Sequence, residues 1–310
     1  MFSLKPPKWV YVLFLMGICS IGIRVILDSR FGNSALLYVA VPFLVSILIF
    51  HLVPSPQDSS KFSRLMLHLK MATVIFLGTS AFLFEGFICV LFFIPIYYLF
   101  VIVGYTFVAL ADWSEQRNSQ KDTLKSSMIP IFVAVLAIEG LSPSTSFERK
   151  NYVHHEVVVD LDIAKLKSNM SLPLELPKRR QWFLSIFPLP VEAQAGSLKD
   201  GDIHKLKFLY KKWFFTNTHE GEFHLKIDEV GDQHVKTSVV KNTSYLSKYL
   251  KIRGTDIEFE PLANGQTKIS LTISYERLLD PAWYFAPMQE YAVQQSADYF
   301  VNSIFLRETM

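Results

Sequence analysis

Residues 256–306 decide the fold: DIEFEPLANGQTKISLTISYERLLDPAWYFAPMQEYAVQQSADYFVNSIFL. Two runs of alternating apolar and polar residues flank Asn264-Gly265, the dipeptide that most favours a tight hairpin turn. A long segment of helical periodicity follows Asp280-Pro281. The stretch therefore predicts a strand, a turn, a second strand and a closing helix. We expect a curved antiparallel sheet that grips this helix and leaves room for a guest molecule.

The expected helix has a defined start and two different faces. Asp280 is a good N-cap, and Pro281 suits the first helical position, where its missing N–H costs nothing. At 100° per residue, the polar stripe contains Glu290, Gln294, Asp298 and Glu308. The opposite face mixes aromatic, small and polar residues, which favours either close packing or a cavity. Its members are Phe285, Gln289, Ala292, Val293, Ser296, Phe300 and Ser303.

The chain before this stretch has two parts of different composition. Residues 1–143 hold ten of the 31 Lys and Arg residues and seven of the 28 Asp and Glu residues, with long apolar runs between them. Residues 144–310 hold the rest of the charge, with no net charge. We therefore expect a transmembrane helical domain over 1–143 and a folded α+β domain over 144–310. The slight excess of basic residues lies in the membrane part, which indicates lipid headgroups as partners and argues against nucleic acid.

The second domain follows a regular order of elements. The pattern predicts a strand, two short helices, about six antiparallel strands and the long helix. In chain order we expect a strand over Tyr152–Asp162, helices over Ile163–Met170 and Lys178–Phe187, strands over Val191–Ser197, His204–Trp213, Glu220–Val230 and His234–Asn242, and a loop or helical insertion over Tyr245–Arg253.

The first domain predicts four or five transmembrane helices. Trp9–Leu27 reads as a retained helix rather than a cleaved signal peptide, because no small-residue cleavage site follows it. Residues 71–111 are long enough for two spans that turn near Glu85-Gly86. The apolar runs are Trp9–Leu27, Ala35–Val53, residues 71–111 and the shorter Met128–Leu141.

The positive-inside rule places the cationic segments 57–70 and 112–127 in the cytoplasm. The Met128–Leu141 run then decides the topology. If it spans the bilayer, there are five helices and the second domain lies outside; if it lies on the surface, there are four and that domain is cytoplasmic. We favour five helices in a bacterial inner membrane, with the second domain on the periplasmic side.

Two groups of charged residues are candidates for a functional role. Arg24, Glu85 and Glu139 all fall near the outer ends of their helices, where ionisable groups either form a functional cluster or reach interfacial water. Lys178, Arg179 and Arg180 precede Trp182, which suits contact with lipid headgroups or a solvated loop.

Motifs for catalysis and cofactors are missing from the sequence. There is no GxSxG, P-loop, GxGxxG or HExxH pattern, and the two cysteines, Cys19 and Cys89, both lie within apolar runs. His219 and His224 would face opposite sides of a strand, which argues against a shared metal ion. His154 and His155 would also face opposite sides, so one of them looks inward. We expect no metal, no cofactor and no catalytic residue.

The second domain resembles the START-like, helix-grip superfamily, also called SRPBCC or polyketide cyclase/dehydrase-like. The resemblance covers roughly residues 148–308. It rests on the Tyr152–Asp162 strand before a helical break, the Gly196 to Gly201 hairpin, GEFHLKIDEV (221–230), and EFEPLANGQTKISLTISYERL (258–278) before an aromatic last helix. The first domain also resembles the membrane part of multi-pass bacterial proteins that carry a START-like domain at their C-terminus. The stretch that matches is Glu85-Gly86-Phe87-Ile88-Cys89.

This resemblance implies a hydrophobic cavity between the sheet and the last helix. The leading hypothesis is a membrane-anchored domain that binds a lipid or another hydrophobic small molecule for sensing, holding or transfer, with Phe285, Gln289, Ala292, Ser296 and Phe300 as cavity residues. The alternatives are a cyclase- or hydrolase-like enzyme that acts on an apolar membrane-derived substrate, and an assembly factor with a filled core.

Overall fold

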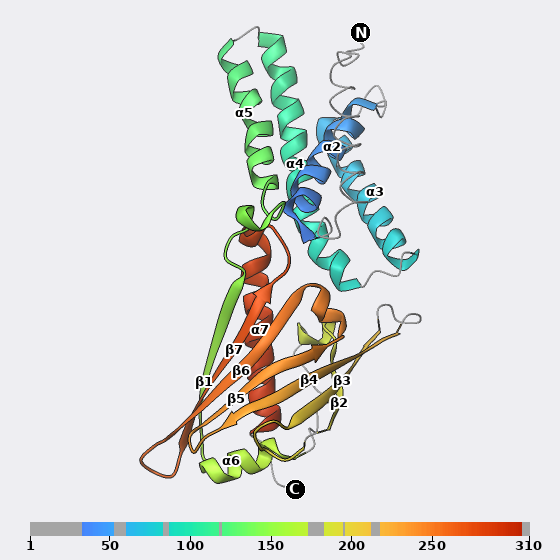
Figure 1. Ribbon diagram of the computed structural model, residues 1–310. Helices are drawn as coiled ribbons and strands as arrows, with labels where there is room; N and C mark the ends of the chain where they lie inside the picture. Colours follow the sequence, from blue (N-terminus) through green and yellow to red (C-terminus); the bar gives the residue numbers. More distant parts are fainter. Residues whose placement is uncertain are drawn as a thin grey trace. The chain divides into compact units, whose positions relative to one another are not determined.

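The computed structural model divides the chain into two compact units (Figure 1). It describes residues 33–52, 60–82, 87–117, 120–172, 183–194, 196–211 and 218–305. The helical unit combines the chain up to Phe147 with the short segment Leu279–Tyr284. The sheet unit combines Glu148–Leu278 with the chain from Phe285 onward.

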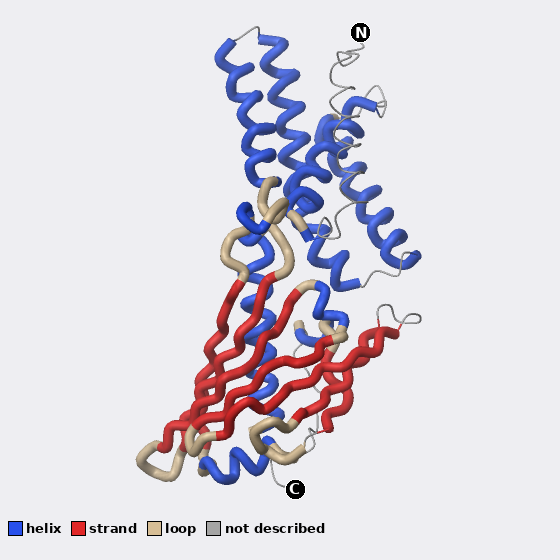
Figure 2. The backbone as a smooth tube through the Cα atoms, viewed as in Figure 1, coloured by secondary structure: helices blue, strands red, loops and turns tan. Residues whose placement is uncertain are grey.

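The sheet unit is a seven-stranded antiparallel sheet with a long helix across one face (Figure 2). The strands follow the order β1-β7-β6-β5-β4-β3-β2, so the first strand pairs with the last and every other neighbour is a sequential hairpin. This arrangement confirms the helix-grip prediction. The elements are β1 (Lys150–Val159), α6 (Ile163–Met170), β2 (Leu189–Gln194), β3 (Ile203–Lys211), β4 (Thr218–Val230), β5 (His234–Asn242), β6 (Leu250–Pro261), β7 (Thr267–Arg277) and α7 (Ala282–Ile304).

The β6–β7 hairpin forms as its sequence predicts. Asn264 and Gly265 both have positive φ, 96° and 78°, which suits a tight turn that matches the twist of the strands. Side chains along β7 alternate strictly between buried and half-buried. A slip of one residue would turn all of the buried side chains to the other face, so this alternation fixes the register.

Two sequence-based boundaries differ from the structure. Leu250–Arg253 belongs to β6 instead of a loop or helical insertion, and only Tyr245–Lys248 forms a short 3₁₀ turn. The reason is pairing, since residues 250–252 lie opposite residues 275–277 of β7. Of the second expected short helix, residues 178–182 lie outside the described residues, and Leu184–Ile186 forms a 3₁₀ turn.

Cross-strand ion pairs cover the outer face of the sheet. Lys268 Nζ lies 2.9 Å from Glu156 Oε1 between β7 and β1, and its hydrogen bond lowers the pKa of that carboxyl. Lys241 Nζ lies 2.7 Å from Glu222 Oε2 between β5 and β4. Because these side chains are exposed, each pair contributes little to stability but keeps the outer face hydrated.

The helical unit contains four described α-helices after a π-helical turn, Leu36–Ala40. One apolar segment, Leu91–Ala111 within α4, is long enough to cross a bilayer, and Leu36–Leu48 and Met128–Ala137 are shorter apolar segments. The described residues therefore do not support a multi-pass arrangement by this measure, and the Trp9–Leu27 run lies outside them. The helices are α2 (Val41–Leu52), α3 (Lys61–Phe82), α4 (Phe87–Arg117) and α5 (Gln120–Ala137).

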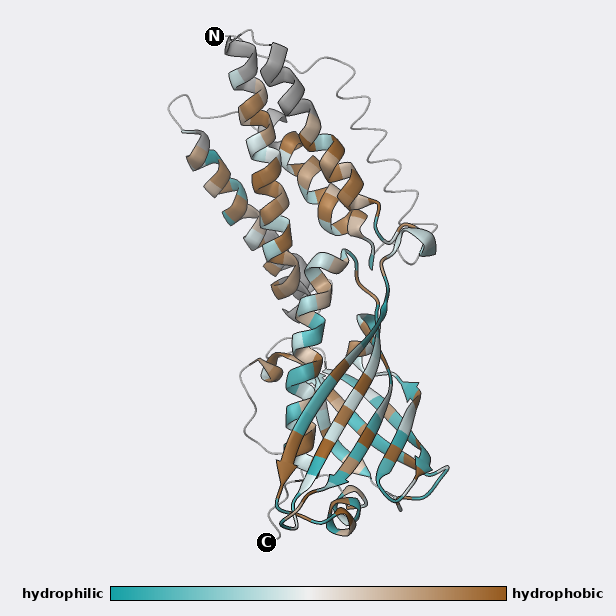
Figure 3. Ribbon diagram, turned by 90° about the vertical axis from the view of Figure 1, so that its left-hand side faces the viewer, coloured by the Kyte–Doolittle hydropathy of each residue, from teal (hydrophilic) through white to brown (hydrophobic). Residues whose placement is uncertain are grey.

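The helices of the helical unit consist largely of hydrophobic residues (Figure 3), and several of their large apolar side chains are exposed. Exposed apolar stripes follow α3 and α5 at helical spacing. Between α3 and α4, His68 Nε2 is 3.3 Å from the Tyr97 hydroxyl, and both side chains are buried. The stripes are Leu67, Met71 and Val74 on α3, and Met128, Ile131, Phe132 and Val135 on α5. The same helices also enclose apolar cores, in which Val39 packs with Ile96 and Leu69 packs with Val101.

Small residues bring α2 and α4 close together. A Cβ on Gly104 of α4 would lie 2.0 Å from Ser46 Oγ of α2, so a larger residue there would force the Ser46 side chain to move. The Ser46 hydroxyl donates a hydrogen bond to the Phe43 carbonyl oxygen at 2.7 Å within its own helix. Close packing through small residues is typical of helices that associate in lipid.

The first turn of α7 packs within the helical unit. Glu139, which is buried, accepts a hydrogen bond from the Ala282 N–H at 2.8 Å through its Oε1. A carboxylate at this place is favoured by the partial positive charge of a helix N-terminus. The backbone N–H of Asp280 donates to the Asn33 carbonyl, and the Tyr284 hydroxyl donates to the Phe92 carbonyl.

This contact corrects the predicted cap. The helix begins at Ala282, one residue later than expected, so Pro281 precedes the first turn and the Asp280 carboxyl is not the acceptor that Ala282 uses. Of the expected Arg24–Glu85–Glu139 cluster, Arg24 and Glu85 lie outside the described residues, so that cluster stays a prediction.

We expect Gly140→Ala to destabilise the protein strongly. Gly140 has φ +82°, and a Cβ would lie 2.2 Å from Asp280 Oδ2, a fully buried side chain. The substitution combines left-handed strain of roughly 1–2 kcal/mol with displacement of that carboxyl. Thermal unfolding of the purified full chain, followed by circular dichroism, measures the effect.

Gly265→Ala is the matched control. Gly265 has φ +78°, but a Cβ there meets nothing within 4 Å, so the control carries the backbone strain alone. The lower melting midpoint should belong to Gly140→Ala; equal midpoints would mean that Asp280 imposes no packing constraint.

Candidate ligand site on the last helix

One continuous ridge of α7 is buried in the sheet unit. Every fourth residue from Phe285 onward is buried: Phe285, Gln289, Val293, Ala297, Val301 and Phe305. Because four residues turn an α-helix by slightly more than one full turn, this ridge winds around the axis and the helix crosses the sheet obliquely. The predicted inner face was a straight stripe, so Ala297 and Val301 were left out of it.

The ridge packs on one half of the sheet. Its last four members form a core with apolar residues of β1, β5, β6 and β7, and with Leu166 of α6. The rings of Phe259 and Phe305 meet edge to face at 6.1 Å. Full burial of a Val or Phe side chain contributes about 1.5–3 kcal/mol, so the ridge stabilises this half of the sheet.

The other half of the sheet has its own apolar cluster. Ala193, Leu206, Phe208 and Phe223, from β2, β3 and β4, are buried together. Among the described residues, no buried side chain of α7 belongs to this cluster. The sheet therefore has a second apolar cluster, which is buried without contributions from buried side chains of α7 among the described residues.

The predicted cavity residues divide into two groups. Phe285 and Gln289 are buried members of the ridge, and Phe300 packs beside Leu184 and Tyr299. Ala292 and Ser296 are half-buried on a flank of the helix, and the Ser296 hydroxyl donates to the Ala292 carbonyl oxygen at 2.8 Å. This flank is small and internally satisfied, so it presents mostly apolar surface.

Gln289 holds the one polar group of the ridge. Its Nε2 donates to the Tyr249 carbonyl oxygen at 3.2 Å, which fixes the orientation of the amide. Its Oε1 is buried and has no hydrogen-bond partner. A buried acceptor without a hydrogen bond costs about 1–3 kcal/mol of folding free energy. A ligand that donates a hydrogen bond to this oxygen would recover that cost.

Aromatic residues surround the partner of Gln289. Tyr245 is buried, stacks on Tyr210 at 4.8 Å and meets the Tyr249 ring at 5.7 Å. His219 lies edge-on to Tyr245 at 5.7 Å, and Lys248 Nζ lies 5.0 Å over the Tyr245 ring. Sequence reasoning missed this cluster, although the spacing of Tyr245 and Tyr249 over one helical turn was a signal for it.

A polar seam ties the edge strand β1 to α7. His155 Nδ1 lies 3.1 Å from Gln294 Nε2, and His155 Nε2 lies 3.8 Å from Asp298 Oδ1. His154 instead contacts the Thr272 hydroxyl at 2.9 Å and is exposed. The two histidines thus face opposite sides of β1 as expected, and His155 looks toward the helix.

Several predicted residues fall outside this description. Lys178, Arg179, Arg180 and Trp182 all lie outside the described residues, so their headgroup contact stays a prediction. Within the described ranges, no group of three or more His, Cys, Asp or Glu side chains is placed to hold a metal ion.

Tyr275 of β7 lies in the core of the sheet unit. Burial, followed by the nearby charge of Glu290, raises its pKa to about 12. The phenol is therefore neutral at physiological pH.

Comparison with solved structures finds similarities that cover about half of this chain. No family model matches the chain, and no curated protein matches it. A START superfamily protein from Mycobacterium smegmatis is 12% identical over 50% of this chain and 95% of its own, with a TM-score of 0.35.

Two enzymes show similar values. Norcoclaurine synthase from Thalictrum flavum is 14% identical over 52% of this chain and 90% of its own, with a TM-score of 0.32. The Zhui aromatase/cyclase from Streptomyces sp. R1128 is 12% identical over 50% and 92%, with a TM-score of 0.33. Values this low carry no weight for function; the helix-grip assignment rests on the strand order and on α7.

The raised pKa of Tyr275 predicts a pH dependence of stability. An unfolded tyrosine ionises near pH 10, whereas the folded one holds its proton to about pH 12. The stabilisation is therefore complete below pH 10 and is lost as the pH rises from about 10 to 12. Urea unfolding of wild type and Tyr275→Phe across this range measures it: the difference between them should shrink as pH rises, and a constant difference would contradict the prediction.

Proposed function

We propose that the sheet unit binds a lipid or another hydrophobic small molecule, and that the helical unit holds it at a membrane. The observation that carries the ligand proposal is Gln289 Oε1, a buried acceptor without a partner on an otherwise apolar ridge. Ligand sites are mostly apolar with a few oriented polar groups, and Gln289 provides one such group beside apolar surface.

The apolar surface for the body of the ligand is the second cluster of the sheet together with the flank of α7. The cluster of Leu206, Phe208 and Phe223 contains no buried side chain of α7 among the described residues. Ala292 and Ser296 on the flank are small and half-buried. We place the ligand along this flank, with its polar end at Gln289.

The exposed apolar stripes on α3 and α5 support the membrane part of the proposal. Large apolar side chains such as Phe132 and Val74 are more than 60% exposed, whereas His68 is buried. In water, exposed apolar stripes on several helices would promote aggregation, but in hydrocarbon they are the expected surface. The Leu91–Ala111 segment provides a span of sufficient length.

We expect Ala292→Trp to block ligand binding. The indole would occupy the flank on which the ligand lies. The probe is a fluorescent fatty acid titrated into the purified full chain, and its affinity should fall at least tenfold. Asn302→Trp, at an exposed position of the same helix, is the control and should leave the affinity unchanged.

The wild type decides the proposal. Saturable binding, together with an apolar molecule that co-purifies from its own membrane, supports it. A folded wild type that binds no probe and retains no ligand would overturn it and favour an assembly factor with a filled core.

Gln289→Leu is expected to separate binding from stability. The Tyr249 carbonyl keeps a hydrogen bond from the Leu278 N–H at 3.2 Å, so the variant leaves no buried acceptor without a hydrogen bond and should melt at or above the wild-type temperature.

A long-chain alcohol should bind wild type about 2- to 10-fold more tightly than its methyl ether, because only the alcohol donates a hydrogen bond. Displacement of the fluorescent probe measures both. The preference should vanish in Gln289→Leu; its persistence would show that Gln289 is no anchor.

A further inference from the structure

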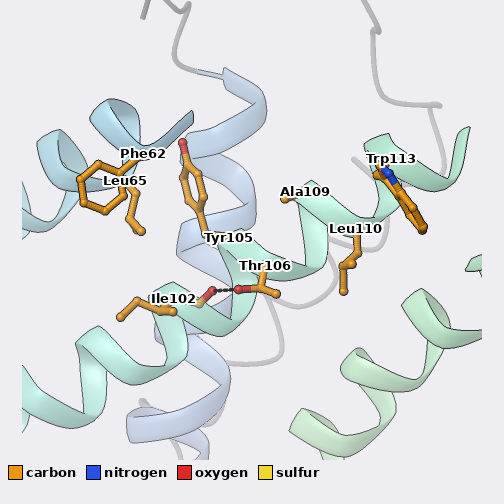
Figure 4. A pocket seen from close by; sticks show the side chains of 8 residues that line it. All are labelled: Phe62, Leu65, Ile102, Tyr105, Thr106, Ala109, Leu110 and Trp113. Carbon is orange, nitrogen blue, oxygen red and sulfur yellow. Dashed lines mark hydrogen bonds between the residues drawn. The ribbon is translucent and has the colours of Figure 1, made fainter. Parts of the chain in front are cut away.

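The helical unit contains a second apolar feature, a groove between α3 and α4 (Figure 4). Phe62 and Leu65 of α3 form one wall. Ile102, Tyr105, Ala109 and Trp113 are among the residues of α4 that form the other. Its volume is about 630 Å³, and it is open along its length.

The groove offers almost purely apolar contact. Thr106 also lines the groove, but its hydroxyl already donates a hydrogen bond to the Ile102 carbonyl oxygen at 2.8 Å. The hydroxyl therefore does not need a polar group from the occupant. Phe62 at the rim is 68% exposed and Trp113 is 41% exposed. An occupant would therefore gain hydrophobic contact and lose no hydrogen bond.

The length and the lining of the groove suit a hydrocarbon chain. From Ile102 to Trp113 the groove extends about 16 Å along α4, at about 1.5 Å per residue. Its lining is almost entirely apolar, which matches the chemistry of an acyl chain.

The position of the groove fixes the polarity of the occupant. The apolar segment of α4 ends at Ala111, and Trp113 follows at the point where a span would meet the headgroups. Arg64 of α3 directly precedes Leu65, which lines the groove, so a cationic residue lies next to the groove in the chain. Guanidinium groups bind phosphate well.

We propose that this groove binds one acyl chain of a membrane phospholipid, with the phosphate of the lipid toward Arg64. The proposal rests on the proposed membrane location but not on a ligand in the sheet unit. It assigns to the helical unit a lipid site of its own, distinct from the surrounding bulk lipid because the chain lies within a furrow between two helices.

The test uses the full chain in vesicles of phosphatidylethanolamine and phosphatidylglycerol, with a trace of phospholipid that carries a diazirine in its acyl chain. After illumination, mass spectrometry of peptides should find the label concentrated on Phe62–Leu65 and Ile102–Trp113. Ala109→Phe fills the groove and should lower this labelling at least fivefold. Ala134→Phe, on the exposed face of α5, is the matched control and should change nothing.

A second measurement examines the headgroup. Native mass spectrometry of detergent-purified protein should show a retained phospholipid in wild type and at least a threefold loss in Arg64→Gln, whereas Ala134→Phe keeps it. Labelling spread evenly over the exposed residues of α5, or unaffected by Ala109→Phe, would overturn the groove. A chain that does not fractionate with membranes would overturn both the groove and the membrane location.

Discussion

The burial of one ridge of α7 against half of the sheet is the constraint on which the sheet unit depends. Val293, Ala297, Val301 and Phe305 join four strands and α6 in a single core. The strands of that half can be covered by one helix only if the helix crosses them obliquely, which is what the four-residue spacing produces. The remaining strands form a second apolar cluster without buried side chains of α7 among the described residues.

The two units bury apolar cores alike but expose different side chains. In the sheet unit, charged pairs cover the outer face and apolar side chains fill the interior. In the helical unit, the interior contains His68 hydrogen-bonded to Tyr97, whereas apolar stripes point outward. Within the sheet unit, Gln289 Oε1 is one of several buried side-chain atoms that have no hydrogen-bond partner among the described residues, and it is the one that lies on the ridge of α7.

Local features of the fold could be predicted from the sequence. The Asn264-Gly265 turn, the alternation along β7 and the Ile163–Met170 helix all depend on neighbours in the chain, and the structure has them as expected. Burial of Phe285 and Gln289 also followed from helical periodicity. The winding of the ridge did not, because it depends on the angle at which α7 meets the sheet.

Long-range partners could not be predicted in this way. The acceptor at the start of α7 comes from Glu139, 143 residues earlier in the chain, and a single sequence does not show such a pairing. The partner of Gln289 is a backbone carbonyl, which has no side-chain signature at all. The site was therefore predictable as a set of positions on one helix but not as a set of contacts.

Leu279–Tyr284 belongs to the helical unit although nearly all of the sheet unit precedes it in the chain. The contacts that Asp280, Ala282 and Tyr284 make in the helical unit therefore join parts of the chain that are at least 143 residues apart. No single cut in the chain separates the two units: a fragment that stops before residue 279 lacks part of the helical unit, and a fragment that starts after residue 147 carries that part away.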